Sequence, residues 1–285
     1  MKTPKGSIYI STKDYFKSQE AFDLVQDSSK EILITTPQPA PEHLASYYES
    51  QAYISHSNTQ KGGVAFLYAM VQKWSLKNKR NLVNKLSNQK GTLLDIGAGT
   101  GAFCETTKQN SWEVFGVEPS EKAREIAAQK NIFLHQSIEE FKGQQFDVVT
   151  LWHVLEHLPD LEKTITAIQK LLKPKGVLIV AVPNYNSYDA KHYKGFWAAY
   201  DVPRHLWHFS QKGMRKLFSK NMKLLKTKPM VFDSFYVSLL SEKYKTGNTF
   251  SIKALWIGLW SNIRALKTKE HSSLIYCFKK EQNHF

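Results

Sequence analysis

Residues 93–101, with the sequence LLDIGAGTG, constrain the fold of this chain more than any other segment. An apolar run that contains Asp95 leads directly into three glycines at every second position. Such a run predicts a buried strand, and glycines let the main chain turn tightly and approach a ligand closely. The spacing differs from the G-x-G-x-x-G spacing of dinucleotide-binding turns. This segment therefore predicts a ligand-binding turn after a buried strand.

Apolar runs and amphipathic stretches alternate around this turn. The pattern predicts helices over residues 64–87, 102–109, 120–130 and 161–172, and strands over residues 92–96, 113–117, 132–135, 146–151 and 177–182. Alternation of this kind indicates a parallel sheet with helices on both faces. Further along we expect a helix over residues 210–220, a strand over 224–231, helical structure over 235–269 and a last strand over 273–278. Residues 1–60 are expected to be irregular.

Four blocks of sequence carry a resemblance to a known family. They are LLDIGAGTG at 93–101, VFGVEPS at 114–120, FDVVTLWHVLEH at 146–157 and LLKPKGVLIVAVPN at 171–184. In this order they resemble the class I S-adenosylmethionine-dependent methyltransferases, and most of all the group related to the ubiquinone-biosynthesis O-methyltransferases. The resemblance implies an α/β fold with a Rossmann-like, doubly wound sheet of seven strands, mostly parallel with an antiparallel last strand. It also implies S-adenosyl-L-methionine as the cofactor.

The chemistry of these blocks suits that cofactor. The glycine turn would pass close to its methionine part, and Asp95 would attract its ammonium group or position the loop. A carboxylate at Glu118 can accept hydrogen bonds from both ribose hydroxyls, although a solvated acid at a strand end is the alternative. The resemblance places adenine contacts after the third strand, where relatives commonly have an acid and this chain has none. The predicted cofactor-binding residues are Asp95, Gly97, Ala98, Gly99, Gly101, Glu118, Pro119, Gln136, Ser137, Ile138, Trp152 and His153.

Histidines near the predicted site are candidates for removing a proton from the methyl acceptor. Methyl transfer is an in-line displacement, so the protein orients the acceptor and takes a proton where the acceptor is a hydroxyl. We predict His153 and His205 as catalytic residues, whereas His157 is expected to be a structural hydrogen-bonding residue. Asp201 and Arg204 are expected to form an ion pair that fixes the loop around His205. A role of this loop in structure alone is the alternative.

Two segments leave alternatives open. Eight aromatic residues between Tyr185 and Phe209 would either wall an apolar acceptor pocket or form a small core under the loop. Residues 251–269 form an apolar stripe at helical spacing, with two tryptophans and several cations. This helix is expected to pack on the body of the protein and to cap the acceptor site, with peripheral membrane contact as the alternative.

We expect a division into an N-terminal extension over residues 1–60, a possible lid, and a methyltransferase domain over residues 61–285. The domain would comprise a core over 91–184, an acceptor-side loop over 185–209 and a helical insertion over 235–269. The two cysteines, Cys104 and Cys277, suggest buried, reduced thiols in a cytoplasmic protein. No Cys/His spacing indicates a metal, so no metal is predicted. The longest strongly apolar run is too short to span a bilayer.

The sequence favours methyl transfer to a small molecule, apolar or aromatic, at a hydroxyl oxygen. The net charge of +14 is concentrated in residues 185–285, which carry 18 Lys or Arg and 6 Asp or Glu. That charge motivates an alternative, methylation of nucleic acid or protein. Against nucleic acid, the fourth strand is followed by WHVL rather than by an Asn/Asp-Pro-Pro-Tyr/Phe sequence. A catalytically degenerate, cofactor-binding subunit is a further alternative, and the intact glycine turn argues against it.

Overall fold

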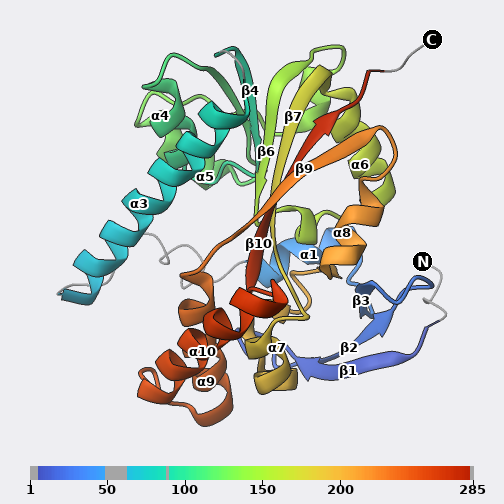
Figure 1. Cartoon of the computed structure of the whole chain (residues 1–285), viewed down its shortest axis with the longest axis vertical. Helices are drawn as coiled ribbons and strands as arrows, with labels where there is room; N and C mark the ends of the chain where they lie inside the picture. The colour runs from blue at the N-terminus through green and yellow to red at the C-terminus, as the bar shows by residue number, and fades with distance from the viewer. Residues whose placement is uncertain (1–5, 49–62, 88–89, 283–285) are drawn as a thin grey trace.

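A six-stranded sheet forms the centre of the molecule (Figure 1). The structure is a computed structural model that describes residues 6–48, 63–87 and 90–282. The strands run in the order β5-β4-β6-β7-β10-β9. β4, β5, β6 and β7 are parallel, whereas β10 is antiparallel to both of its neighbours. Their bounds are β4 (Thr92–Ile96), β5 (Glu113–Val117), β6 (Phe146–Trp152), β7 (Leu172–Pro183), β9 (Met222–Pro229) and β10 (Ser273–Lys280).

This sheet confirms the predicted α/β fold and the antiparallel last strand, but it has one strand fewer than predicted. The missing strand is residues 132–135, which contribute one isolated bridge between His135 and Val117. Directly afterwards the Ser137 side chain caps the short helix η1 (Ile138–Phe141), so the chain turns away before a second pair forms. The prediction of a strand here was wrong because pairing ends after one residue.

Helices cover both faces of the central sheet, and the alternation of side chains along each strand produces two cores. In β7, Leu178 and Val180 face one core, whereas Val177 and Ile179 face the other. α6 (Leu161–Lys170) and α8 (Gln211–Leu217) close the first core, and α3 (Gly63–Leu86) and α4 (Ala102–Lys108) close the second (Figure 1). α5 (Glu121–Ala128) follows β5, and the Ser120 side chain accepts a hydrogen bond from its first turn. Within the described residues, no helix is long and apolar enough to span a membrane.

The N-terminal region is ordered where we predicted irregular structure. β1 (Ile8–Lys13), β2 (Ala21–Gln26) and β3 (Ile32–Thr36) form a second sheet with β8 (Trp207–Phe209), followed by α1 (Pro41–Tyr48). β3 also pairs with β8, a strand that comes from the loop region after β7 in the sequence. β1 has no buried residue, whereas β2 and β3 each bury one face. Local antiparallel pairing of β1 with β2 and of β2 with β3 therefore builds most of this sheet, and β8 adds a distant strand at its edge.

The aromatic residues after β7 form a core rather than the wall of an open pocket. Tyr193, Trp197 and Tyr200 are only 1–2% exposed and pack against Phe22 and Leu24 of β2. They lie on α7 (Tyr188–Tyr193), η3 (Lys194–Phe196) and η4 (Ala198–Tyr200). This cluster anchors the N-terminal sheet to the methyltransferase-like core. Of the two alternatives for these residues, the structure supports the small core.

A helical hairpin separates β9 from β10, as predicted. α9 (Asp233–Thr246) and α10 (Ile252–Thr268) pack on one another below the central sheet (Figure 1). Gly258 allows the close approach, since a Cβ there would lie 2.9 Å from the Phe235 Cα. The first turn of α9 places Asp233 near the carboxyl end of β6, where the candidate site lies.

Candidate functional site

The glycine turn lies between β4 and α4, at the carboxyl end of β4, which pairs with β5 and β6. The backbone N–H groups of Gly97 and Ala98 both donate to the Val117 carbonyl oxygen, at 2.8 and 2.9 Å. This pairing fixes the turn against β5. Gly97, Gly99 and Gly101 all have positive φ, a conformation that glycine adopts without strain. A Cβ built on Gly99 meets no atom within 4 Å, so the tip of the turn faces open space.

The three glycines are not equivalent, which gives a stability test. Gly99→Ala should cost about 1–2 kcal/mol, because only backbone strain opposes it. Gly97→Ala should cost at least about 1 kcal/mol more, because its Cβ would also lie 2.3 Å from Val154 Cγ2. Urea unfolding of both variants measures the difference. Equal losses would show that Val154 moves aside freely.

Glu118 extends from the end of β5 onto this turn. Its carboxylate accepts hydrogen bonds from the backbone N–H groups of Gly99 and Ser120, at 2.8 and 3.0 Å. The side chain is half-buried and lies beside the open space over Gly99. A carboxylate that is held by backbone donors keeps acceptor sites for further hydroxyl donors. The glycine turn and Glu118 therefore fit the ribose and methionine parts of S-adenosylmethionine.

The segment predicted to contact adenine lies beside Glu118. The Glu118 N–H donates to the His135 carbonyl at 2.9 Å, which brings residues 136–138 to the same edge. There the backbone N–H groups of Gln136 and Ser137 donate to Glu140, so the backbone of this segment is held in place. Pro119 and Gln136 are exposed, and Ser137 and Ile138 are half-buried. The structure thus gathers these residues at one strand edge.

Asp95 lies beneath the turn rather than on its open side. It is 2% exposed and accepts a hydrogen bond of 2.5 Å from the Thr150 hydroxyl. Burial outweighs this bond and the nearby Lys79 charge, and it raises the pKa of Asp95 to about 7. Of the two roles predicted for Asp95, the geometry favours positioning of the loop.

Trp152 ends β6 beside the site, and Lys79 of α3 lies above it. The Lys79 ammonium is 4.5 Å from the centroid of the Trp152 ring. Burial lowers the pKa of Lys79, although the charges of Asp95 and Asp233 oppose this. The Lys79 side chain is therefore within electrostatic reach of both acids at the edge of the site.

His153 is held between two carboxylates. Its Nδ1 lies 3.3 Å from Glu156 Oε1, and its Nε2 lies 3.2 Å from Asp233 Oδ2. Burial disfavours the imidazolium, but the hydrogen bonds and charges of Asp233 and Glu156 outweigh burial and raise the pKa of His153 to about 9. At neutral pH the ring is therefore an imidazolium. That state does not suit a general base, so the predicted base role of His153 gains no support from this geometry.

The ionisation of His153 should be visible in the pH dependence of stability. Its folded-state pKa is raised from 6.5 to about 9, so its stabilising effect is complete below pH 6.5 and is lost as the pH rises through about 9. We expect the unfolding free energy of the wild-type protein to exceed that of His153→Gln most at about pH 6, and the gap to close by about pH 10. A gap that is constant with pH would contradict the charged state.

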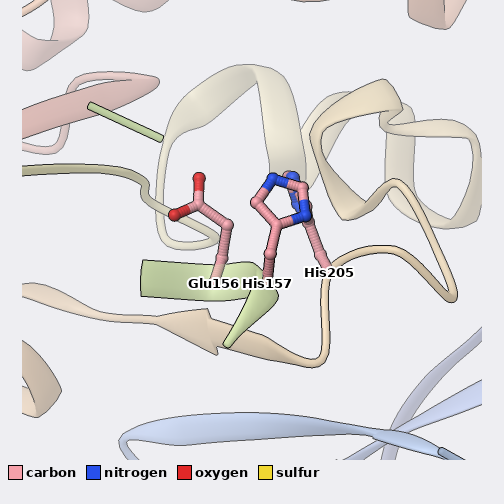
Figure 2. Close-up of side chains that lie close together, drawn as sticks. All are labelled: Glu156, His157 and His205. Carbon is pink, nitrogen blue, oxygen red and sulfur yellow. The ribbon is translucent and has the colours of Figure 1, made fainter. Parts of the chain in front are cut away.

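Glu156, His157 and His205 form a second polar cluster behind His153. Glu156 and His157 come from η2 (Leu155–His157), and His205 comes from the loop before β8 (Figure 2). Each offers one ligand atom within 4.8 Å of the others. Glu156 Oε2 is buried without a hydrogen-bond partner. Carboxylate and imidazole ligands are types that hold divalent metals, so this cluster is the place in the described residues where an ion would fit. The predicted absence of a metal stays a prediction.

The imidazoles of this cluster are anchored by backbone carbonyls. His205 Nδ1 lies 2.9 Å from the Ala199 carbonyl oxygen, and burial holds the pKa of His205 well below its ordinary value. His157 Nδ1 lies 3.0 Å from the Arg204 carbonyl oxygen and 2.9 Å from the Tyr48 hydroxyl. His157 is thus the structural hydrogen-bonding residue that we predicted.

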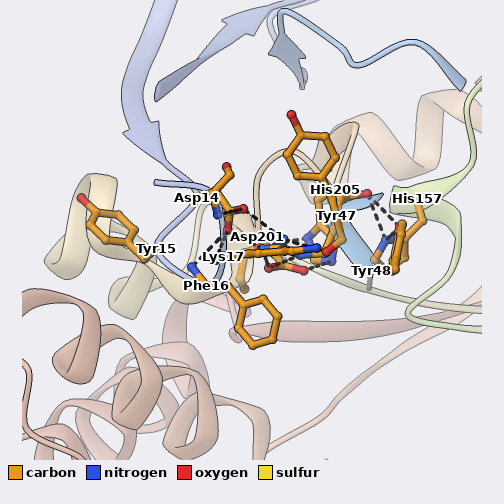
Figure 3. Close-up of polar contacts among 12 residues, drawn as sticks. Asp14, Tyr15, Phe16, Lys17, Tyr47, Tyr48, His157, Asp201 and His205 are labelled. Carbon is orange, nitrogen blue, oxygen red and sulfur yellow. Dashed lines mark hydrogen bonds and ion pairs between the residues drawn. The ribbon is translucent and has the colours of Figure 1, made fainter. Parts of the chain in front are cut away.

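An ion-pair network ties this loop to the N-terminal sheet (Figure 3). Arg204 lies 2.6 Å from Asp201 and 2.8 Å from Asp14, and its side chain is 1% exposed. The predicted Asp201–Arg204 pair is confirmed, and Asp14 is a partner that the sequence did not reveal. The possible lid over residues 1–60 stays a prediction, and residues 49–62 lie outside the described residues. Tyr48, at the end of α1, contacts His157.

Sequence reasoning missed Lys79, Glu156, Asp233 and Asp14. Lys79 and Asp233 come from α3 and α9, which lie outside the four sequence blocks. Glu156 lies within a block, but no pattern in that block indicates its contact with His153. No local pattern marks Asp14 or Asp233, because their partners come from distant segments.

Comparison with known proteins agrees with this geometry. A family model described as a methyltransferase domain matches residues 71–221, more than half of the chain. The ubiquinone biosynthesis O-methyltransferase of Aromatoleum aromaticum is 36% identical over 104 residues, covering 33% of this chain and 44% of that protein. The enzyme of the same name from Saccharophagus degradans is 34% identical over 104 residues, with the same coverage. The matched part thus spans less than half of these relatives.

Solved structures share the fold. The magnesium protoporphyrin IX methyltransferase of Synechocystis, with bound S-adenosylhomocysteine, has a TM-score of 0.57 at 15% identity. The alignment covers 85% of this chain and 100% of that one. The same protein with bound S-adenosylmethionine gives a TM-score of 0.54 at 14% identity, over 87% and 100% of the two chains. With the family model, the glycine turn and Glu118 taken together, this protein belongs to the class I S-adenosylmethionine-dependent methyltransferases.

Proposed function

We propose that this protein methylates a hydroxyl oxygen of a small aromatic molecule. The observation that carries the proposal is the row Asp233–His153–Glu156, which places two carboxylates and one imidazolium at the end of β6. Such a row carries one net negative charge, which suits a site where a sulfonium meets an acceptor that loses a proton. The names of the relatives from Aromatoleum and Saccharophagus support oxygen as the acceptor atom.

The cofactor side is proposed to use the residues around the glycine turn. Gly97, Ala98, Gly99 and Gly101 would hold the methionine part, with Asp95 positioning the turn from below. Glu118 and Pro119 would hold the ribose. Adenine would lie along Gln136, Ser137 and Ile138, with Trp152 at the rim. When bound, the cofactor supplies the electrophilic methyl group.

The acceptor side is proposed to lie between α3 and the start of α9. Trp74 and Phe232 meet edge to face with ring centroids 5.1 Å apart, and they are 51% and 43% exposed. They form an apolar wall next to Asp233, and this wall suits an aromatic acceptor. Asp233, the more exposed of the two carboxylates at His153, would receive the hydroxyl proton. The His153 imidazolium would then stabilise the oxyanion that attacks the methyl group.

His205 takes a different role in this proposal from the catalytic one predicted. It is 8% exposed, and its Nδ1 is engaged by a backbone carbonyl. We assign it as a positioning residue that supports Glu156 and thereby His153.

An assay with labelled S-adenosylmethionine tests the function. We expect methyl transfer to phenols or catechols, with the methyl group on oxygen by mass spectrometry of the product. Asp233→Asn should lower kcat by about a hundredfold while binding of S-adenosylhomocysteine is kept. Asp160→Asn, at an exposed helix cap outside the row, is the matched control. Methylation of amines, RNA or protein alone would refute an oxygen acceptor.

A further inference from the structure

Helix α10 buries its small residues and exposes its large apolar residues. Its small residues face the protein: Ala254, Gly258, Ser261 and Ala265 are all buried. Its large apolar residues face outward, with Trp256 65%, Trp260 47% and Leu266 69% exposed. A helix that packs on a protein normally buries its large apolar side chains. The helix therefore packs on the body of the protein as expected, but it does so with its small residues, and most of the apolar stripe is left exposed.

The outward residues form one continuous face. At about 100° per residue, they fall within an arc about 120° wide, opposite the buried small residues. Phe250, just before the helix, is 68% exposed and extends the same end of the hairpin. We call this set the outer face of α10: Phe250, Ile252, Trp256, Leu259, Trp260, Ile263 and Leu266. Exposed apolar surface on this scale marks an interaction site.

Charge identifies the kind of partner. Residues 234–269 contain six cations, all exposed, and a single acid, Glu242, which is 4% exposed. Lys253, Arg264 and Lys267 run along one edge of the outer face. A second copy of this chain would bring the same cations together, which is unfavourable. Tryptophan beside lysine and arginine is the composition of helices that lie at a lipid interface.

We propose that the outer face of α10 docks on an anionic lipid surface. The tryptophans would lie at the level of the headgroups and the aliphatic side chains just below, while the cations contact lipid phosphates. This inference goes beyond the proposed function and does not depend on it. It also has a geometric consequence: α9, whose first turn carries Asp233, packs on the opposite side of α10 and would lie behind that helix as seen from the lipid surface.

Vesicle sedimentation of the full chain tests the proposal. We expect the protein to sediment with vesicles of phosphatidylcholine and phosphatidylglycerol, and much less with phosphatidylcholine alone. Trp256→Ser with Trp260→Ser should lower the partition coefficient by at least about tenfold. Lys267→Gln should lower it by about fivefold. Phe133→Ser removes an exposed aromatic residue outside this face, 78% exposed, and should leave binding within about twofold.

Circular dichroism and sedimentation equilibrium without lipid accompany these measurements. All of the substituted side chains are exposed, so the variants should keep the wild-type spectrum and melting temperature. No binding to anionic vesicles, or equal binding by the wild-type protein and the tryptophan variant, would overturn the proposal. A lipid-free dimer that disappears in the tryptophan variant would assign the face to a second copy and would equally overturn it.

Discussion

Glu118→Ala is expected to weaken binding of S-adenosylhomocysteine by about a hundredfold, equivalent to about 3 kcal/mol. The variant removes the carboxylate proposed to accept both ribose hydroxyls. It also removes the acceptor that holds the Gly99 N–H at 2.8 Å, so the turn loses its support. Hydrogen bonds to a charged acceptor are worth more than neutral ones, which is why a single substitution has this effect. Isothermal titration calorimetry measures it directly.

Two further variants serve as controls for the effect of Glu118→Ala on binding. Glu121→Ala removes an exposed acid from the first turn of the following helix and should leave the affinity unchanged within about twofold. Glu118→Gln keeps the shape but loses the charge, so its affinity should lie between those of the wild-type protein and Glu118→Ala. Unchanged binding of S-adenosylhomocysteine by Glu118→Ala would refute the assignment of the ribose site, but it would not affect the fold assignment.

Asp14→Ala should lower the free energy of unfolding by about 3–5 kcal/mol. The Asp14 and Arg204 side chains are 0% and 1% exposed, so the guanidinium would lose one of its two carboxylates inside the protein. Asp14 also accepts backbone N–H bonds from Phe16, Lys17 and Ser18, which the substitution would leave without this acceptor. Urea unfolding followed by tryptophan fluorescence measures the loss.

The exposed pair Asp160–Lys163 provides the comparison. Lys163→Ala breaks a contact of 3.0 Å in which the lysine side chain is 87% exposed, and it should change stability by less than about 1 kcal/mol. The double variant Asp14→Ala/Arg204→Met also removes the buried guanidinium charge of Arg204. It should therefore recover part of the lost free energy of unfolding. If Asp14→Ala alone cost no more than Lys163→Ala, the N-terminal sheet would be held by other contacts.

Local sequence signals were sufficient for the core of the fold. The buried strand and the glycine turn at 93–101 are recognisable because their conformations are set by their own residues. The same holds for the caps at Ser120 and Ser210, whose side chains bond to the first turn of their own helices. The four blocks also fixed where the cofactor is expected, since the carboxyl ends of parallel strands meet at one edge.

Prediction failed where the deciding partner is distant in the sequence. β8 joins the N-terminal sheet beside β3 from a distant part of the sequence, and Arg204 meets an acid 190 residues away. The aromatic residues after β7 are compatible with a pocket or a core, and only the arrival of β2 buries them. When a segment distant in the sequence buries a residue, the local sequence pattern around that residue does not indicate it.

The sequence alone determined the parallel α/β sheet, the methyl-donor turn and the acid at Glu118, because each depends on residues adjacent in the chain. Only the tertiary structure decided the charge of His153 and the orientation of α10. The charge of His153 depends on Asp233, which a different element brings within 3.2 Å. The periodicity of α10 shows which residues share a face, but burial is set by the side that neighbouring helices cover, and they cover the small residues.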